Sequence, residues 1–182
     1  MQNTECILST TYFGPVQWYQ KLYRYSHVLI EQYETFPKQT YRNRCLIATT
    51  NGVQALTVPV HHASEPSSLH PSPVTLHQKI SDHGNWRHLH WNALCSAYGM
   101  SPFFEFYADD IRPFYEERWE KLFDFNRDTT AKMLHLIGLS NTLAKEPPQR
   151  YYQTFQRRHG FIEGMSILDL LFNEGPEAVR YI

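Results

Sequence analysis

The densest concentration of residues able to do chemistry lies at positions 81–92, which read Ser-Asp-His-Gly-Asn-Trp-Arg-His-Leu-His-Trp-Asn. Two tryptophans, three histidines, one arginine and two asparagines stand within this segment. Each of their polar groups needs a hydrogen-bond partner or water once the chain is ordered. This density indicates the wall of a small-molecule pocket. The alternative is that the tryptophans and histidines simply pack on the core.

A helix that presents two faces fits this segment. Asn85 is expected to cap its start, and Gly99 is expected to end it in the left-handed conformation. The expected apolar stripe is Trp86, Leu89, Ala93 and Ala97. Helical spacing places a second group on another face, free to meet a ligand: His83, Arg87, Trp91 and Cys95.

The histidines are the candidate acid–base groups, because histidine alone titrates near neutral pH when unperturbed. His83, His88 and His90 are the candidate catalytic residues, with His83 or His88 favoured as the base. His88 and His90 lie about 200° apart around a helix, so they cannot share a metal ion there. No other spacing of metal ligands is recognisable, and neither a metal nor a cofactor is expected.

Cys6, Cys45 and Cys95 are too widely spaced for a thiolate zinc site, and their odd number does not predict a disulfide framework. Cysteine usage of this kind favours the reducing cytoplasm. Cys45 or Cys95 with a histidine, or Ser81 with His83, would be needed for nucleophilic catalysis. None of these has a diagnostic setting, and a buried cysteine is usually a core residue.

The clearest local prediction is a β-hairpin of Thr40–Thr49 and Val53–Val60 around the turn Asn51-Gly52. Alternation along the first strand places Arg42 and Arg44 on one face. Two adjacent guanidinium groups call for an anionic partner. That partner is either a substrate phosphate or carboxylate, or a glutamate such as Glu31 or Glu34.

The N-terminal segment predicts a βαβ-like unit. A strand is expected from Cys6 to Phe13, a helix from Gly14-Pro15 to about Tyr25, and a second strand from His27 to Tyr33. The start of the helix offers backbone N–H groups that can hold a phosphate or carboxylate. Gly14 stands alone, whereas phosphate loops usually contain several glycines.

The rest of the chain predicts a long loop, a short strand and several helices. The expected elements are a Pro/Ser/His loop at 61–74, a strand at 75–80, a helix at 102–107 interrupted at 109–113, a long helix at 115–136 ended by Gly138, one more strand at 141–145, a helix at 167–172 capped by Ser166, and a short helix from Gly175-Pro176. The predicted class is α+β: a mixed sheet, formed by the N-terminal unit and the hairpin, packed by C-terminal helices.

Composition sets the remaining limits. With 182 residues and 42% hydrophobic content, the chain fits one domain spanning 1–182. A net charge of −1 argues against general nucleic-acid binding, which needs a basic excess. The first residues show no leader pattern, and no apolar stretch approaches about 18 residues, so neither secretion nor membrane insertion is expected.

Several ordered segments resemble the WbqC-like protein family. The matching segments are Tyr12-Phe13-Gly14-Pro15 followed by Trp18-Tyr19, Tyr41-Arg42-Asn43-Arg44, Leu56-Thr57-Val58-Pro59-Val60, the Trp-x-x-x-His run from Trp86 to His90, Tyr98 to Phe103, and Trp119, Leu122 and Asn126. Where the family carries Gln-Pro, this chain has Ser9-Thr10-Thr11. A catalytic role for that Gln in relatives would therefore not carry over to this chain.

The resemblance implies a bacterial protein of O-antigen or polysaccharide gene clusters, for which glycine or aminoacyl transfer to a sugar has been suggested. The ligand would be an activated sugar or an aminoacyl donor. The expected substrate-binding residues are Tyr12, Lys21, Arg42, Asn43, Arg44, Trp86, Arg87 and Trp91. The expected arrangement is one open cleft shared by Tyr12, Arg44, Trp86 and His90.

Two other functions fit the sequence, and the oligomeric state stays open. One is a non-catalytic binding or scaffold protein of envelope biosynthesis, since tyrosine and tryptophan suit interfaces. The other is a nucleotidyltransferase-like enzyme, which rests on the opening strand, loop and helix.

Overall fold

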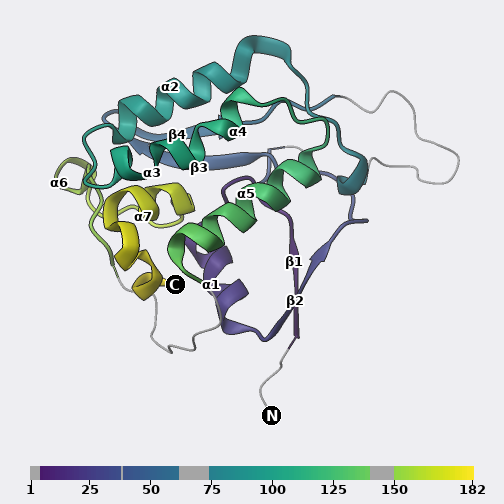
Figure 1. Ribbon diagram of the computed structural model, residues 1–182, viewed down its shortest axis with the longest axis horizontal. Helices are drawn as coiled ribbons and strands as arrows, with labels where there is room; N and C mark the ends of the chain where they lie inside the picture. Colours follow the sequence, from purple (N-terminus) through teal and green to yellow (C-terminus); the bar gives the residue numbers. More distant parts are fainter. Residues whose placement is uncertain (1–4, 38, 62–73, 140–149) are drawn as a thin grey trace, which may run out of the picture.

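A computed structural model describes residues 5–37, 39–61, 74–139 and 150–182. Most of the loop expected at 61–74 and the strand expected at 141–145 lie outside the described residues. The strands are β1 (Glu5–Ser9), β2 (His27–Glu31), β3 (Arg44–Thr49) and β4 (Gly52–Thr57). The α-helices are α1 (Val16–Arg24), α2 (Trp86–Tyr98), α3 (Phe104–Ile111), α4 (Pro113–Glu116), α5 (Leu122–Ile137), α6 (Gln156–His159) and α7 (Ile167–Glu174), and 3-10 helices occupy Thr75–His77, His83–Asn85 and Gly175–Tyr181 (Figure 1). The α+β class is confirmed.

The N-terminal βαβ unit is confirmed. β1 and β2 pair in parallel, with Cys6 opposite Val28, and α1 connects them. Pro15 has an extended backbone and precedes the first helical residue. Val16 and Tyr19 are the buried residues of the helix.

The hairpin is also confirmed, with β3 and β4 antiparallel around Asn51-Gly52. Gly52 has a φ of +107°, a conformation that favours glycine. The two strand pairs form separate two-stranded sheets within the described residues, not one mixed sheet. Ser166 lies between the hairpin and the N-terminal unit, because it donates its N–H to the carbonyl of Leu46 at 2.9 Å and forms an isolated β-bridge with Pro15.

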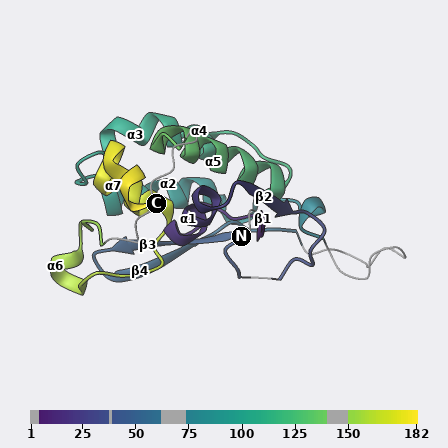
Figure 2. The ribbon, with the colours of Figure 1, turned by 90° about the horizontal axis from the view of Figure 1, so that it is seen from below.

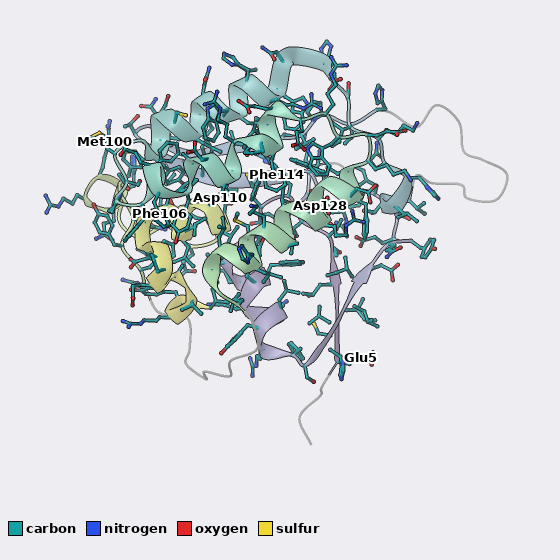
Figure 3. All side chains as sticks on the ribbon, viewed as in Figure 1. Glu5, Met100, Phe106, Asp110, Phe114 and Asp128 are labelled. Carbon is teal, nitrogen blue, oxygen red and sulfur yellow. The ribbon has the colours of Figure 1, made fainter. Side chains whose placement is uncertain are left out.

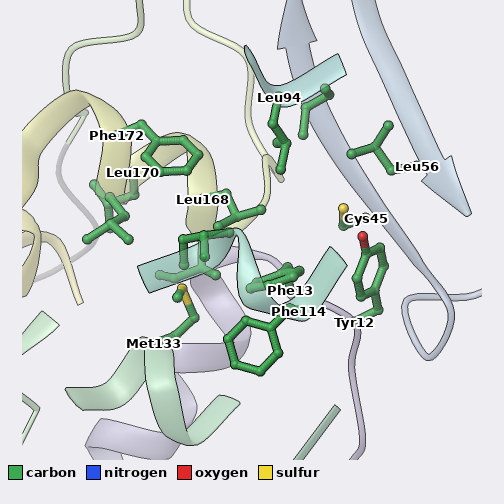
Figure 4. Close-up of a cluster of buried hydrophobic side chains, with 14 of the residues drawn as sticks. Tyr12, Phe13, Cys45, Leu56, Leu94, Phe114, Met133, Leu168, Leu170 and Phe172 are labelled. Carbon is green, nitrogen blue, oxygen red and sulfur yellow. The ribbon is translucent and has the colours of Figure 1, made fainter. Parts of the chain in front are cut away.

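Helices α2, α5 and α7 lie on one side of the β3–β4 pair (Figure 2). Their apolar faces enclose a core in which Phe13, Leu94 and Phe172 have no exposed surface. Tyr12 and Cys45 approach each other in the same core (Figure 4). Burying a side chain such as Leu94 contributes about 1.5–3 kcal/mol.

Helix α2 lies between Asn85 and Gly99 as expected, but neither residue has the predicted conformation or role. Asn85 has a φ of +48° and makes no side-chain cap, and Gly99 is right-handed. A Cβ on Gly99 would lie 2.6 Å from the carbonyl oxygen of Cys95, so close approach requires glycine here. The expected stripe was wrong at Leu89, which is 59% exposed. The buried residues of α2 are Trp86, His90, Leu94, Ala97 and Tyr98.

The expected interruption at 109–113 is present but short: α3 ends at Ile111 and α4 begins at Pro113. The expected start of the long helix at 115 was wrong, because a second break falls at 117–121. Backbone pairing explains this break: Ile80 donates to the Glu120 carbonyl at 2.9 Å, and Leu122 donates to the Gln78 carbonyl at 2.9 Å. The strand expected at 75–80 was wrong over its first half, because Thr75–His77 form a 3-10 helix. Only the residues after His77 take part in the backbone pairing.

Two further helix ends lie at the residues predicted from the sequence. Gly138 ends α5 with a φ of +73°, and Ser166 caps α7 by accepting the N–H of Leu168 at 3.2 Å. Two large apolar side chains point away from the core: Met100 and Phe106 are 93% and 73% exposed (Figure 3).

Candidate functional site

A cavity of about 400 Å³ opens between the first half of α2 and the segment around α4; we call it the α2–α4 cleft. It is lined by Asp82, Asn85, Arg87, His88, Trp91, Arg112, Tyr115, Glu116 and Arg118. Asp82, Asn85, Arg87, His88 and Trp91 belong to the segment at 81–92 that the sequence singled out. Of the group predicted to face a ligand, Arg87 and Trp91 line the cavity, whereas His83 and Cys95 do not.

Arg87 is the most constrained charged group of the cleft, with a side chain only 14% exposed. Its Nη1 donates to a carboxylate oxygen of Asp82, and its guanidinium lies 4.8 Å from the ring centroid of Trp86. Its Nε and Nη2 are buried and find no hydrogen-bond partner among the described residues. These two donors form one edge of the guanidinium fork, the edge that can hold a carboxylate or phosphate in bidentate fashion.

The electrostatics of the cleft favour an anion. Three arginines face two acids in the lining, which leaves a formal excess of one positive charge. Glu116 is bound by Arg112 at 2.6 Å. The hydrogen bond from Arg87 lowers the pKa of Asp82, so this carboxylate stays ionised and fixes the arginine. Arg118, 88% exposed and 4.0 Å from Asp82, is the cation that can most readily turn to a ligand.

Trp91 and Tyr115 give the cleft an aromatic side. Their ring centroids are 6.0 Å apart with a tilt of 39°. Trp91 is half-buried, so part of its surface is available for stacking. His88 is exposed, and its Nε2 lies 2.9 Å from the carboxamide of Asn92, which orients the imidazole ring. Asn85 lines the same cavity in the left-handed conformation, a form of backbone strain often found at functional sites.

Tyr12, Trp86 and His90 do converge, but in the interior and not in an open cleft. They are 0%, 4% and 6% exposed. The hydroxyl of Tyr12 lies 2.9 Å from Nδ1 of His90 and 2.9 Å from the hydroxyl of Tyr115. Burial lowers the pKa of His90 to about 4, against the smaller opposing effect of a backbone hydrogen bond at Thr57. His90 is therefore neutral at physiological pH.

Of the two hairpin arginines, Arg42 is already bound to an acid. Arg42 lies before β3, where it binds Glu34 through Nε at 2.7 Å and also contacts Ser9. The glutamate alternative is thus confirmed for Arg42. Arg44 lies in β3, and its buried Nε has no hydrogen-bond partner within the described ranges.

The other predicted site residues lie outside the α2–α4 cleft lining. Asn43 is buried and donates to the Val58 carbonyl at 3.0 Å. Lys21 is exposed on α1, and His83 is exposed in the turn before α2. Trp86 donates its indole N–H to the Ser81 carbonyl at 3.0 Å, so its polar group is already satisfied.

The start of α1 is covered by the chain after Met165. Val16 donates to the Met165 carbonyl at 3.3 Å, and Gly14 accepts from Ile167 at 2.9 Å. A Cβ on Gly14 would lie 2.4 Å from Thr11 Oγ1, so this loop is closed tightly on itself. The anion binding that the sequence allowed at this helix start gains no support, because the Val16 N–H is already bonded.

The candidate nucleophiles and metal ligands gain no support from geometry. All three cysteines are free thiols, and burial raises the pKa of Cys45, which keeps it protonated in the core. In the part of the chain that the structure describes, no three His, Cys, Asp or Glu side chains gather closely enough to hold a metal ion.

Sequence reasoning missed the second wall of the cleft. Arg112 and Arg118 flank α4, and Tyr115 lies within it. An available signal was the i,i+4 spacing of Arg112 and Glu116, which is typical of a helix with a charged outer face. No local pattern reveals that this face meets α2.

Comparison with known proteins gives one family and one distant relative. The model of the WbqC-like protein family matches residues 10–148 and 144–181. The uncharacterized protein Rv1507c of Mycobacterium tuberculosis is 28% identical over 202 aligned positions, covering 81% of this chain and 83% of the relative. No solved structure is significantly similar.

None of the described helices combines the length and apolarity needed to cross a bilayer.

Proposed function

Since this chain belongs to the WbqC-like protein family, we propose that it is a group transferase that acts on a sugar or surface-polysaccharide precursor in the cytoplasm. The ligand site is the α2–α4 cleft, and the transferred group is an aminoacyl group such as glycine, or a similar group. The observation that carries the proposal is the unpaired Nε/Nη2 edge of Arg87, buried beside a cavity with a positive excess. A phosphate or carboxylate of the donor substrate would complete its hydrogen bonds.

Other side chains of the cleft supply the remaining functions. Trp91 provides a partly exposed aromatic face on which a sugar or base can stack. His88, exposed at the cleft, accepts the proton of an acceptor amine or hydroxyl as this group attacks the donor, and its Nε2 gives up the bond from Asn92 to do so. Arg118 then neutralises the anion that leaves. This assignment retains Arg87, His88 and Trp91 from the sequence and adds Arg118.

Calorimetric titration of nucleotide-sugars and aminoacyl phosphates tests the proposal. Charge-assisted hydrogen bonds contribute about 1.5–3 kcal/mol, so Arg87→Gln should weaken binding roughly tenfold to a hundredfold. Arg87→Lys keeps the charge but not the fork, and should also weaken binding. The control is Arg127→Gln, since Arg127 is a surface residue that pairs with Asp124 and Asp128.

Four outcomes are decisive. Binding that requires Arg87 but not Arg127 supports the site, and product formation abolished by His88→Ala supports the reaction. Binding that survives both Arg87 variants would refute the assignment. A wild-type chain that binds none of these compounds would favour the scaffold alternative.

A further inference from the structure

A second cavity, of about 530 Å³, lies beside α6 on the C-terminal segment; we call it the α6 cavity. It is lined by Arg150, Tyr151, Tyr152, Gln156, Arg157 and Phe161. It shares no residue with the α2–α4 cleft. Whatever binds there is therefore recognised by a separate set of side chains.

The loop that carries the α6 cavity is held in a fixed shape by one side chain. Gln153, 1% exposed, donates through Nε2 to the Ile162 carbonyl and accepts the Ile162 N–H, both at 2.9 Å. This pair of bonds joins the two ends of the loop as a β-bridge would. The backbone of Tyr152 is in turn tied to α7 by a 2.7 Å bond to Glu174. The cavity is thus preorganised, which lowers the entropic cost of binding.

The aromatic wall is supported from the core. Tyr151 donates its hydroxyl to Asp169 at 2.7 Å, and its ring meets Phe161 edge-on at 5.5 Å with an interplanar angle of 86°. Phe161 is half-buried, while Tyr152 is 47% exposed. The rings of Tyr152 and Phe161, from opposite ends of one loop, therefore border the same cavity.

The two arginines of the cavity are not paired with an acid among the described residues. Arg150 lies over Phe161, with 5.6 Å between its guanidinium carbon and the ring centroid. Neither Arg150 nor Arg157 forms an ion pair with a carboxylate in the described ranges. A guanidinium stacked on an aromatic ring keeps its N–H edge free for an oxyanion.

We propose that the α6 cavity is a second binding site, for a small organic anion that carries a flat ring. The ring would lie on Tyr152 and Phe161, and its phosphate or carboxylate would bridge Arg150 and Arg157. Gln156 would hydrogen-bond a ring substituent. The site is distinct from that of the transfer reaction proposed above, because the two cavities share no lining residue.

Backbone amide NMR on the full chain tests this site by location. The probes are phenyl phosphate and glucose 1-phosphate, which distinguish an aromatic from a sugar ring, and inorganic phosphate, which has no ring. Phenyl phosphate, whose ring is flat, should shift the amides of Tyr152, Gln156 and Phe161 and bind at least fivefold more tightly than glucose 1-phosphate or inorganic phosphate. Arg150→Gln and Arg157→Gln should each weaken binding at least fivefold.

Two controls separate this proposal from the others. Arg158→Gln changes an exposed neighbour that does not line the cavity, and Arg87→Gln disables the α2–α4 cleft. Neither should alter the shifts at the α6 cavity. Absence of shifts at these amides with every probe, equal affinity for inorganic phosphate, or equal weakening by Arg158→Gln would overturn the proposal.

Discussion

Replacing His90 with Asn should make the protein less sensitive to mild acid. The imidazole is 6% exposed, and its pKa lies at about 4 in the folded chain. In the unfolded chain a histidine titrates near about 6.5. The unfolded state therefore binds more protons between these two values, and the folded state loses stability as the pH falls from about 6.5 towards 4.

The size of this effect follows from the two pKa values. Each pKa unit corresponds to about 1.4 kcal/mol, so the full difference is roughly 3 kcal/mol, of which about 2 kcal/mol is lost between pH 7.5 and pH 5. Asparagine cannot take up a proton, yet its oxygen can still accept the Tyr12 hydroxyl that now bonds Nδ1. His90→Asn will cost stability at pH 7.5 through lost packing, but it removes the histidine contribution to the pH dependence.

Urea unfolding at pH 7.5 and pH 5 measures this contribution directly. Between these pH values, the unfolding free energy of His90→Asn should fall about 2 kcal/mol less than that of wild type. His135→Asn is the matched control, since it makes the same substitution at a histidine that is exposed on α5. If His90→Asn and wild type lose the same free energy, the neutral buried imidazole is refuted.

Three further substitutions test the packing that positions the cleft, each by urea unfolding at pH 7.5. Leu94→Ala removes a fully buried side chain beneath α2 and should cost about 2–5 kcal/mol; a loss below 1 kcal/mol would mean that the core is loose there. Ser166→Ala removes the cap of α7 and should cost about 1 kcal/mol, whereas an unchanged midpoint would argue against the cap. Glu34→Gln weakens the bond to Arg42 and should cost about 1–3 kcal/mol, and equal stability would show that this pair contributes nothing.

Local signals predicted the elements whose formation depends on nearby residues. Asn51-Gly52 specified the hairpin turn because it tolerates positive φ. Ser166 specified the start of α7 because its side chain satisfies a free N–H. The Trp/His segment at 81–92 indicated α2 and contains five of the residues that line the cleft.

Features set by distant contacts could not be read from local patterns. The start of α5 depends on backbone bonds between 78–80 and 120–122. The orientation of α2 depends on His90, which looks polar in sequence but is buried because Tyr12, 78 residues away in sequence, provides a hydrogen-bond partner. The helix is therefore oriented so that His90 is buried and Leu89 is exposed. The second wall of the cleft is missed for the same reason, since α4 meets α2 only after folding.

Arg87 is the side chain proposed to bind the oxyanion of the ligand. Its Nε–H resonance in a ¹H–¹⁵N spectrum tests this most directly. Arg87→Lys assigns the signal by its disappearance, and the Nε–H of Arg127, already bonded to Asp128 at 2.8 Å, serves as an internal reference. During titration with a nucleotide-sugar, the Arg87 signal should move downfield as a charge-assisted hydrogen bond forms, while the Arg127 signal stays in place. A saturable titration in which the Arg87 signal does not move would show that the ligand binds elsewhere and would contradict the account.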